Sequence, residues 1–188
     1  MNASAPQPNI IMVRPTMADL PEYELPAPYS LRWYKPGDEH AWVRIHELAD
    51  LYNVADVARF EREFGLDEAV LGGRQAYLCD AAGTPIGAAS AWWNDDFEGG
   101  RWGRVHWVAI VPEHQGRGLA KPLLSAVMQR LVELGHERAY LTTNPPRLAA
   151  ISLYLHFGFV PTPFNDEERR NWRKVATELG RDLPGIER

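Results

Sequence analysis

Residues 104–120 read RVHWVAIVPEHQGRGLA, and this stretch contains the pattern that decides the fold. Its first eight residues are mostly apolar and β-branched, which is typical of a buried strand. A glycine-rich turn follows at residues 116–118, and the apolar residues after it recur at helical spacing until Gly135. The stretch therefore predicts a central strand, a glycine-rich turn and an amphipathic helix.

The start of that helix is a candidate anion site. The first N–H groups of a helix have no partner within it, and the positive end of the helix dipole lies behind them. Glycines at 116 and 118 allow an anion to approach closely, and Arg117 or Lys121 can add charge, so the turn is suited to phosphate. Pro122 removes a donor early in the helix, and we expect it to loosen the first turn. A plain strand–helix turn is the alternative, because so short a pattern also arises by chance.

The sequence on both sides alternates between strand and helix patterns. Before the central strand, it predicts a strand at 29–34, helices capped by Asp38 and Asn53, a hairpin over 76–93 and a polar loop over 94–101. After the glycine-rich unit, it predicts a strand at 139–143, a helix at 148–157, a short strand from 159 and a last helix with a capping box of Asn165 and Glu168. This order predicts a single α/β domain.

A chain of 188 residues is near the usual size of one domain. Residues 1–28 hold six prolines and are expected to form an arm, and residues 29–188 are expected to form the domain. The apolar run Ile10–Val13 within the arm can add a strand to a sheet edge, in its own subunit or in a neighbour. A homodimer is therefore a possible assembly.

Composition excludes several classes of protein. The net charge is −5 without a dense Lys/Arg run, which disfavours nucleic-acid binding. The single cysteine, Cys79, excludes an internal disulfide framework and a cysteine-rich zinc site, and no metal is expected. The sequence lacks an apolar run of about 18 residues and a basic start leading into one, so we expect neither a membrane span nor a signal peptide. The expected compartment is the cytoplasm.

Two motifs in order carry a family resemblance. The segment QGRGLA at 115–120, followed by a helix, a strand and then AISLYLHFGF at 150–159, resembles the GNAT superfamily of acetyl-CoA-dependent N-acetyltransferases. The resemblance covers about Gly103–Pro161 and implies a mixed β-sheet, flanked by helices and splayed between the strands at 104–111 and 139–143, with CoA in the split. It also implies direct transfer of an acetyl group from acetyl-CoA to a primary amine of a small molecule or peptide, in a ternary complex. A C-terminal helix is expected here in place of the family's usual closing hairpin.

The resemblance also assigns roles to residues. It implies that the CoA pyrophosphate is held by Gln115, Gly116, Arg117, Gly118, Leu119 and Ala120, and that the pantetheine arm is held by backbone groups of Val108, Ala109 and Ile110. Many relatives contact pantetheine through an asparagine seven residues before a tyrosine; Arg147 occupies that position here, and Asn144 lies three residues earlier. The tyrosine itself is Tyr154, which is expected to protonate the leaving thiolate. His106 stands where many relatives carry an acidic general base.

The chemistry of acyl transfer agrees with these roles. An alkyl ammonium with a pKa near 10.4 is almost entirely protonated at pH 7, so a base that takes its proton is useful, and histidine titrates in a suitable range. A phenol can return a proton to a thiolate. A strand N–H left unpaired at a bulge near 108–110 can stabilise the oxyanion. The alternatives are that His106 and Tyr154 only pack in the core, and that the protein is a non-catalytic acyl-CoA-binding or scaffold module.

Overall fold

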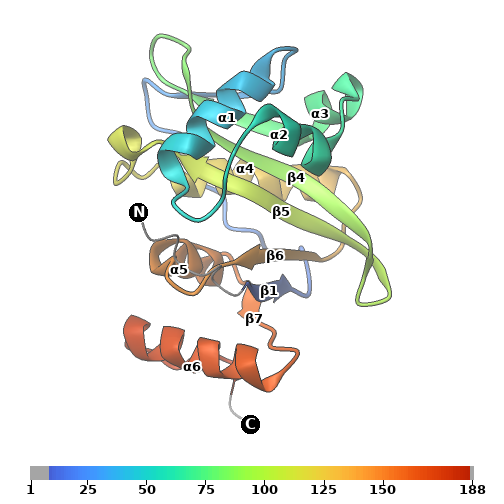
Figure 1. Cartoon of the computed structure of the whole chain (residues 1–188), viewed down its shortest axis with the longest axis vertical. Coiled ribbons are helices and arrows are strands. Elements are labelled where there is room, and N and C mark those ends of the chain that lie inside the picture. Colours follow the sequence, from blue (N-terminus) through green and yellow to red (C-terminus); the bar gives the residue numbers. More distant parts are fainter. Residues whose placement is uncertain (1–8, 187–188) are drawn as a thin grey trace.

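The computed structural model describes residues 9–186, which form one seven-stranded sheet with helices on both faces (Figure 1). The strands are β1 (Ile10–Arg14), β2 (Ser30–Trp33), β3 (Gln75–Cys79), β4 (Pro85–Phe97), β5 (Gly100–Ile110), β6 (Ala139–Thr143) and β7 (Val160–Pro161). The α-helices are α1 (Asp38–Ala49), α2 (Val57–Phe64), α3 (Glu68–Arg74), α4 (Ala120–Glu133), α5 (Leu148–His156) and α6 (Asp166–Leu179). A 3₁₀ turn, Pro112–His114, follows β5. The mixed α/β class and the C-terminal helix are confirmed.

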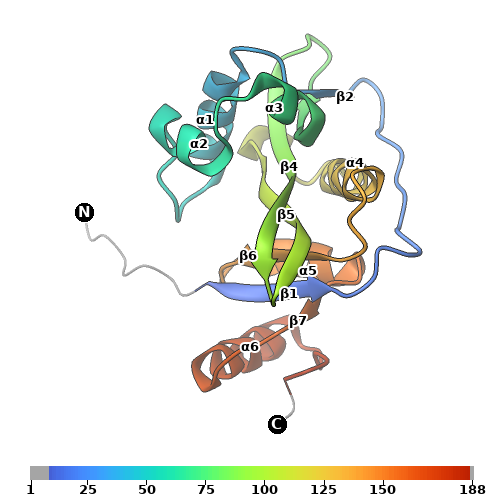
Figure 2. The same cartoon turned by 90° about the vertical axis from the view of Figure 1, so that its right-hand side faces the viewer.

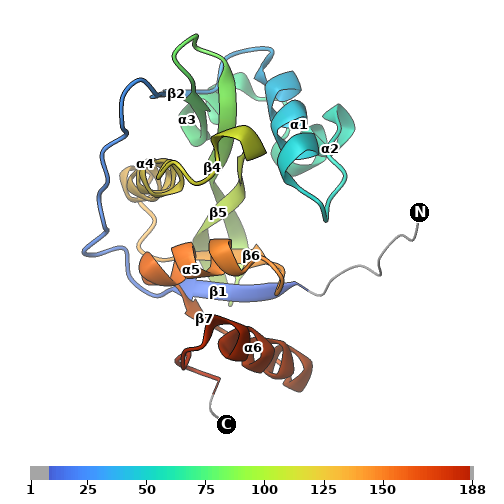
Figure 3. The ribbon, with the colours of Figure 1, turned by 90° about the vertical axis from the view of Figure 1, so that its left-hand side faces the viewer.

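The sheet order is β2-β3-β4-β5-β6-β1-β7, and every neighbouring pair is antiparallel except β5 and β6. Helices α1 and α2 lie on one face of β4 and β5, and α4 lies on the other (Figures 2 and 3). The apolar side of α4, which includes Leu123, Leu124 and Val127, is fully buried. This packing holds β4 and β5 between two helical layers.

The parallel pair β5 and β6 separates soon after it forms. Only Gly103 with Ala139 and Arg104 with Tyr140 are paired between these strands within residues 9–186. Beyond Arg104, β5 runs on to Ile110 without a partner on this side. The sheet is therefore splayed at the predicted place, and the gap exposes the C-terminal half of β5.

β5 carries a bulge at its centre. Ala88 of β4 pairs with Ala109 and Ser90 pairs with His106, so two residues of β5 stand opposite one residue of β4. Trp107, the first of the two, has a φ of 50°, a left-handed conformation that is strained for a bulky side chain. The expected bulge thus exists and begins one residue before the range the sequence indicated.

β1 lies inside the sheet of its own chain, between β6 and β7. Ile10 pairs with Thr143 and Val13 with Val160, and the Ile10 and Met12 side chains are fully buried. The proline-rich stretch after it crosses the molecule to β2 as extended chain (Figure 2). The Ile10–Val13 run is a strand as predicted, and it joins its own sheet between two strands.

In the first half of the chain, one predicted loop and two predicted caps are wrong, and one helix was missed. The polar loop at 94–101 is strand instead, because β4 and β5 continue to a two-residue turn at Glu98 and Gly99, both with positive φ. The cap of α1 is Gly37 and the cap of α2 is Asp56, where Asp38 and Asn53 were expected. Helix α3 was not predicted, because its two glycines hide the helical pattern.

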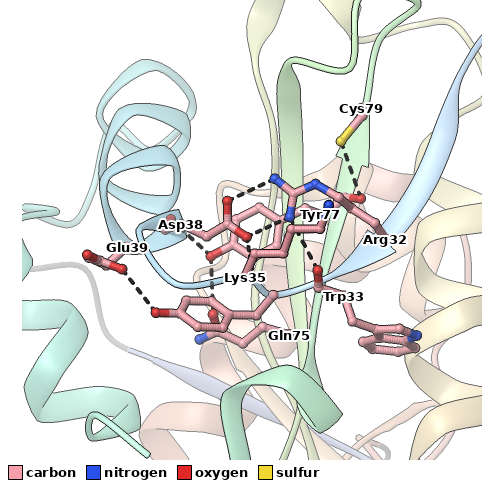
Figure 4. A network of polar contacts seen from close by, with 9 residues as sticks. Arg32, Trp33, Lys35, Asp38, Glu39, Gln75, Tyr77 and Cys79 are labelled. Atoms are coloured by element: carbon pink, nitrogen blue, oxygen red, sulfur yellow. Dashed lines mark hydrogen bonds and ion pairs between the residues drawn. The ribbon is translucent and has the colours of Figure 1, made fainter. Parts of the chain in front are cut away.

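Asp38 instead ties the first helix to the edge strand (Figure 4). Its carboxylate accepts two hydrogen bonds from the Arg32 guanidinium, at 2.6 and 2.8 Å, and one from the Lys35 backbone N–H at 2.7 Å. The Tyr77 hydroxyl donates to the Asp38 carbonyl oxygen at 3.2 Å. This network fixes β2, the turn after it and α1 as one unit.

The C-terminal helix begins as the capping box predicts. The Asn165 side chain accepts a hydrogen bond from the Glu168 N–H at 2.9 Å, and Glu168 accepts one from the Phe164 N–H. Trp172 and Val175 are buried on the inner side of α6. No helix within residues 9–186 is long and apolar enough to cross a membrane.

Candidate active site

Two cavities meet on the exposed half of β5. A mainly apolar cavity of about 720 Å³ lies between the glycine-rich turn and α5, and a polar cavity of about 150 Å³ lies between α1, α2 and the end of β6. Val108 and Tyr154 line both cavities. The bulged part of β5 and the last turns of α5 therefore form the junction between the two.

The glycine-rich turn forms one end of the apolar cavity. Gly116 and Gly118 have φ angles of 72° and 77°, and a Cβ placed on either would meet no atom within 4 Å. Alternation of left-handed glycines with ordinary residues turns successive N–H groups to one side, which makes a concave anion site. The Gln115 side chain donates to the Ile110 carbonyl oxygen at 2.7 Å and so anchors the turn to the end of β5.

We expected Pro122 to loosen the first turn of α4, and this prediction is wrong. Helix α4 begins at Ala120, and its first helical bond runs from the Leu123 N–H to the Leu119 carbonyl at 3.2 Å. Pro122 therefore occupies the first turn, where an N–H would have had no helical partner. The proline therefore removes no hydrogen bond of the helix, and the N–H groups before it have no helical partner and can bind an anion.

The charge beside the turn comes from Lys121. Lys121 lines the apolar cavity, with its ammonium 4.8 Å from the centre of the Tyr23 ring. Arg117 instead bonds the Tyr29 hydroxyl at 3.1 Å and the Glu113 carbonyl at 3.0 Å, and its side chain does not line the cavity. Arg117 can therefore contribute its backbone N–H to the anion site while its guanidinium braces the turn.

His106 lies in the polar cavity against a carboxylate from α2. Its Nε2 is 2.8 Å from Oε2 of Glu63, and the imidazole is only 7% exposed. Burial lowers the pKa of His106 to about 4 despite the opposing effect of Glu63, so the ring is neutral at pH 7. The hydrogen bond from His106, together with its neighbour Arg59, lowers the pKa of Glu63 to about 2.

The neutral imidazole donates its Nε2 hydrogen to the carboxylate and keeps Nδ1 as an acceptor. Arg59 holds the other Glu63 oxygen at 2.8 Å, one helical turn away, and its guanidinium lies over the Trp107 ring. Sequence reasoning missed Glu63, because a carboxylate four residues after an arginine on a helix is usually only a surface pair. The contact between α2 and β5 brings Glu63 to His106.

Tyr154 projects from α5 into the junction. Its side chain is 7% exposed, and its hydroxyl makes no hydrogen bond to another residue of the described part of the chain. Burial raises the pKa of Tyr154 to about 12, so the phenol keeps its proton across the physiological range. The alternative from the sequence was that Tyr154 only packs in the core. In the structure, its side chain lines both cavities.

A buried histidine, His46, also lines the polar cavity. It lies on α1 between the Trp42 and Trp107 rings, at ring-centre distances of 4.5 and 5.0 Å. Its exposure is 1%, and neither ring nitrogen has a hydrogen-bond partner within residues 9–186. Burial lowers the pKa of His46 to about 3. From the sequence alone, the position of His46 in the helical repeat of α1 indicates a core residue, so sequence analysis did not identify His46 as a candidate site residue.

A protein-family model and several known proteins match this chain. The model of the Acetyltransferase (GNAT) family matches residues 23–159 of this chain. The chain belongs to this family. Mycothiol acetyltransferases from Thermobispora bispora and Pseudarthrobacter chlorophenolicus are 31% and 34% identical, with 79% and 76% of this chain aligned to 52% and 46% of theirs. The chain thus spans about half the length of the curated relatives it matches.

The fold is also similar to that of a solved N-acetyltransferase structure. The crystal structure of a GCN5-related N-acetyltransferase from Sphaerobacter thermophilus superposes with a TM-score of 0.67 at 21% identity, covering 84% of this chain and 50% of that chain. The predicted GNAT fold is therefore confirmed. The residue roles that the resemblance implied stay predictions.

Most residues expected to hold CoA lie on the apolar cavity of this GNAT domain: Val108, Ala109, Ile110, Gln115, Gly116, Gly118, Leu119 and Ala120. Asn144 and Arg147 line the polar cavity instead. Arg147 pairs with Asp50 at 2.5 Å across the cavity mouth. Burial alone would favour a neutral Asp50, yet hydrogen bonds from Arg147 and Asn53 lower the pKa of this carboxyl. Asn144 and Arg147 therefore lie away from the other residues that were expected to hold CoA.

Two further histidines of this GNAT domain, His114 and His156, lie beside the expected CoA-binding residues. Both line the apolar cavity, and each bonds a tyrosine from the segment that joins β1 to β2: His114 bonds Tyr29, and His156 bonds Tyr23. These contacts tie the proline-rich segment to the rim of the cavity.

Within residues 9–186, no cluster of three or more His, Cys, Asp or Glu side chains is arranged to hold a metal ion.

Proposed function

We propose that the protein transfers the acetyl group of acetyl-CoA to the primary amine of a small molecule or peptide, by direct attack in a ternary complex. The observation that carries this proposal is that Tyr154 and Val108 line both cavities at the β5 bulge. A thioester at the end of a pantetheine arm in the apolar cavity meets an amine in the polar cavity only at this junction. Membership in the GNAT family supports acetyl-CoA as the donor.

The residues present fit the phosphate end of acetyl-CoA. The open concavity at Gly116 and Gly118 leaves room for a pyrophosphate against backbone N–H groups, and Lys121 supplies a cation beside it. The unpaired half of β5 offers backbone groups to the amides of the pantetheine arm. When bound, acetyl-CoA supplies the activated acetyl group.

The reaction needs three proton transfers. His106 accepts a proton from the ammonium group of the acceptor at Nδ1, and the Glu63 carboxylate stabilises the imidazolium that results. The amine nitrogen then forms a bond to the thioester carbonyl carbon, and an N–H at the bulge near Val108 stabilises the oxyanion. The C–S bond breaks, and the Tyr154 phenol donates its proton to the leaving thiolate. The nitrogen of the new amide gives up its second ammonium-derived proton, which restores the Tyr154 phenol and leaves a neutral amide and free CoA thiol.

The test is an amine-dependent turnover screen with acetyl-CoA. Free thiol release is followed with a panel of amino acids, amino sugars, polyamines and short peptides, and mass spectrometry identifies a product heavier by one acetyl group. Thiol release that requires the amine, together with the acetylated product, supports the proposal. A protein that binds CoA in calorimetry but acetylates no amine contradicts catalysis and favours the alternative, a non-catalytic acyl-CoA-binding or scaffold module.

A further inference from the structure

The polar cavity contains one cation without a counter-charge. Arg59 is paired with Glu63 at 2.8 Å, and Arg147 is paired with Asp50 at 2.5 Å. Arg104 is the third guanidinium on the wall, and it has no ion pair and no hydrogen bond with another residue of the described chain. Its Nε is buried without a partner. With both histidines neutral, three guanidinium groups face two carboxylates, and the cavity has an excess positive charge.

Arg104 stands where an acceptor must lie. It is the last residue of β5 paired with β6, two positions before His106, and alternation along a strand puts both side chains on one face. The Arg104 guanidinium lies 5.6 Å from the centre of the Tyr140 ring, which supports it at the point where the strands separate. Arg104 and His106 therefore line the same cavity, so one molecule can place an anion at Arg104 and an amine at His106.

A second side chain on the cavity wall, that of His46, also has buried nitrogens without a hydrogen-bond partner. His46 is almost completely buried, and both of its ring nitrogens lack a hydrogen-bond partner within residues 9–186. A neutral imidazole provides one donor and one acceptor to a polar ligand. Native proteins rarely leave such groups unpaired, because they lose hydration without gaining a hydrogen bond. Buried nitrogens without a partner on one small cavity, those of Arg104 and His46 among them, point together with the excess positive charge to a polar, negatively charged ligand.

The anion in question does not belong to CoA. The phosphate-binding turn at 116–118 lines the apolar cavity, and Arg104 lines only the polar one. We propose that the acceptor amine also carries an anionic group, a carboxylate or a phosphate, and that Arg104 binds this group. Arg104 is then a specificity-determining residue. This inference rests on the proposed acetyl transfer, because it names the class of amine that the polar cavity accepts.

The experiment uses pairs of amines that differ only by the anion. Glucosamine 6-phosphate is compared with glucosamine, and L-phenylalanine with 2-phenylethylamine, so the two pairs distinguish phosphate from carboxylate. We expect wild-type protein to prefer the anionic member of at least one pair in kcat/KM. Arg104→Gln should reduce kcat/KM for that member about 10- to 100-fold, mainly through KM, and leave the neutral member within about twofold. Arg104→Lys should restore part of the loss.

The matched control is Arg101→Gln. Arg101 is an exposed arginine on the same strand that pairs with Asp95 outside the polar cavity, so its loss should leave every ratio unchanged. A wild-type protein without preference in either pair overturns the inference and leaves acetyl transfer intact. Equal losses for both members in Arg104→Gln also overturn it.

A binding measurement separates this inference from the proposed function. Calorimetry without acetyl-CoA follows glucosamine 6-phosphate, L-phenylalanine and inorganic phosphate binding to wild type and to Arg104→Gln, whose folding is verified by its melting temperature. Anion binding that needs Arg104, in a protein that acetylates no amine, supports the anion site and contradicts the proposed activity. Failure of every anion to bind, combined with no turnover, overturns both.

Discussion

The imidazole of His106, on the central strand β5, lies 2.8 Å from the carboxylate of Glu63, on a helix 43 residues earlier in the chain. Neither residue alone resembles an efficient base at neutral pH, because burial lowers the pKa of His106 to about 4 and the pKa of Glu63 is about 2. In the proposed reaction, the two groups hold one proton between them, because the carboxylate stabilises the imidazolium that forms when the amine is deprotonated.

The first prediction concerns this pair. Glu63→Gln keeps the shape of the side chain and removes the charge, so kcat at pH 7 should fall about 10- to 100-fold. In wild type, the acidic limb of kcat should lie near pH 4 rather than near the ordinary histidine value. His106→Ala should abolish that limb. Steady-state kinetics from pH 4 to 8 with a saturating acceptor measures both effects, and unchanged kcat in both variants would show that the pair only packs.

The second prediction concerns Tyr154. Tyr154→Phe keeps the ring and its contact with Phe159 and removes only the hydroxyl, so turnover should fall about 100-fold or more while CoA affinity changes little. Because the pKa of the phenol is about 12, wild-type kcat should show no basic limb from Tyr154 below about pH 11. Turnover assays and CoA calorimetry on one protein batch test this. Full activity of the variant at pH 7 would remove Tyr154 from the reaction.

The third prediction concerns the phosphate site. Gly118→Glu puts a carboxylate into the concavity of the turn, so affinity for CoA and acetyl-CoA should fall about 100-fold or more. The matched control is Gly135→Glu at the other end of α4, where φ is 80° and space is equally open, so the backbone strain is similar. Calorimetry should show CoA binding in the control only. Equal affinities would locate the phosphates elsewhere.

The fourth prediction concerns the arm. Met12 is fully buried on β1, and Met12→Ala should lower the free energy of unfolding by about 2–4 kcal/mol. Leu51→Ala, at a side chain that is 89% exposed, should change it by less than about 0.5 kcal/mol. Denaturant unfolding measures both variants.

Deletion of residues 1–28 removes the strand between β6 and β7 and should prevent stable folding. A deletion protein with unchanged melting behaviour would contradict this structural role of the arm. The homodimer stays a prediction that sedimentation of the full chain tests, since β1 already has both of its sheet partners within its own chain.

The fifth prediction concerns acid stability. Burial lowers the pKa of His46 to about 3 in the folded protein, below the value near 6.5 in the unfolded chain. The unfolded state therefore binds a proton first as pH falls, so stability is full above about pH 6.5 and is lost down to about pH 3. At pH 5 this loss is about 2 kcal/mol, and His46→Leu should remove it. Unfolding midpoints at pH 7 and pH 5 compare the two proteins, and equal pH sensitivity would contradict the assignment.

Local patterns in the sequence were enough for the glycine-rich unit and most of the elements around it. The apolar run before Pro112, the glycines at 116 and 118 and the capping box at Asn165 act over a few residues, and each appears in the structure where it was predicted. The Tyr154 position also followed from a contiguous motif. Predictions failed where a local signal competed with pairing to a distant strand, as in the polar segment 94–101, which is strand because β4 and β5 pair along it.

Only the tertiary structure decided what surrounds the groups that are proposed to react. Glu63 meets His106, and His46 meets Trp107, because α1 and α2 pack over β5, and helix-to-sheet contacts leave no mark at fixed spacing in the sequence. Asn144 and Arg147 lie on the polar side because β6 diverges from β5. The unpaired charge of Arg104 is likewise a property of its neighbours. Composition and periodicity identify the residues of an element, whereas burial, pairing and pKa depend on which elements meet in space.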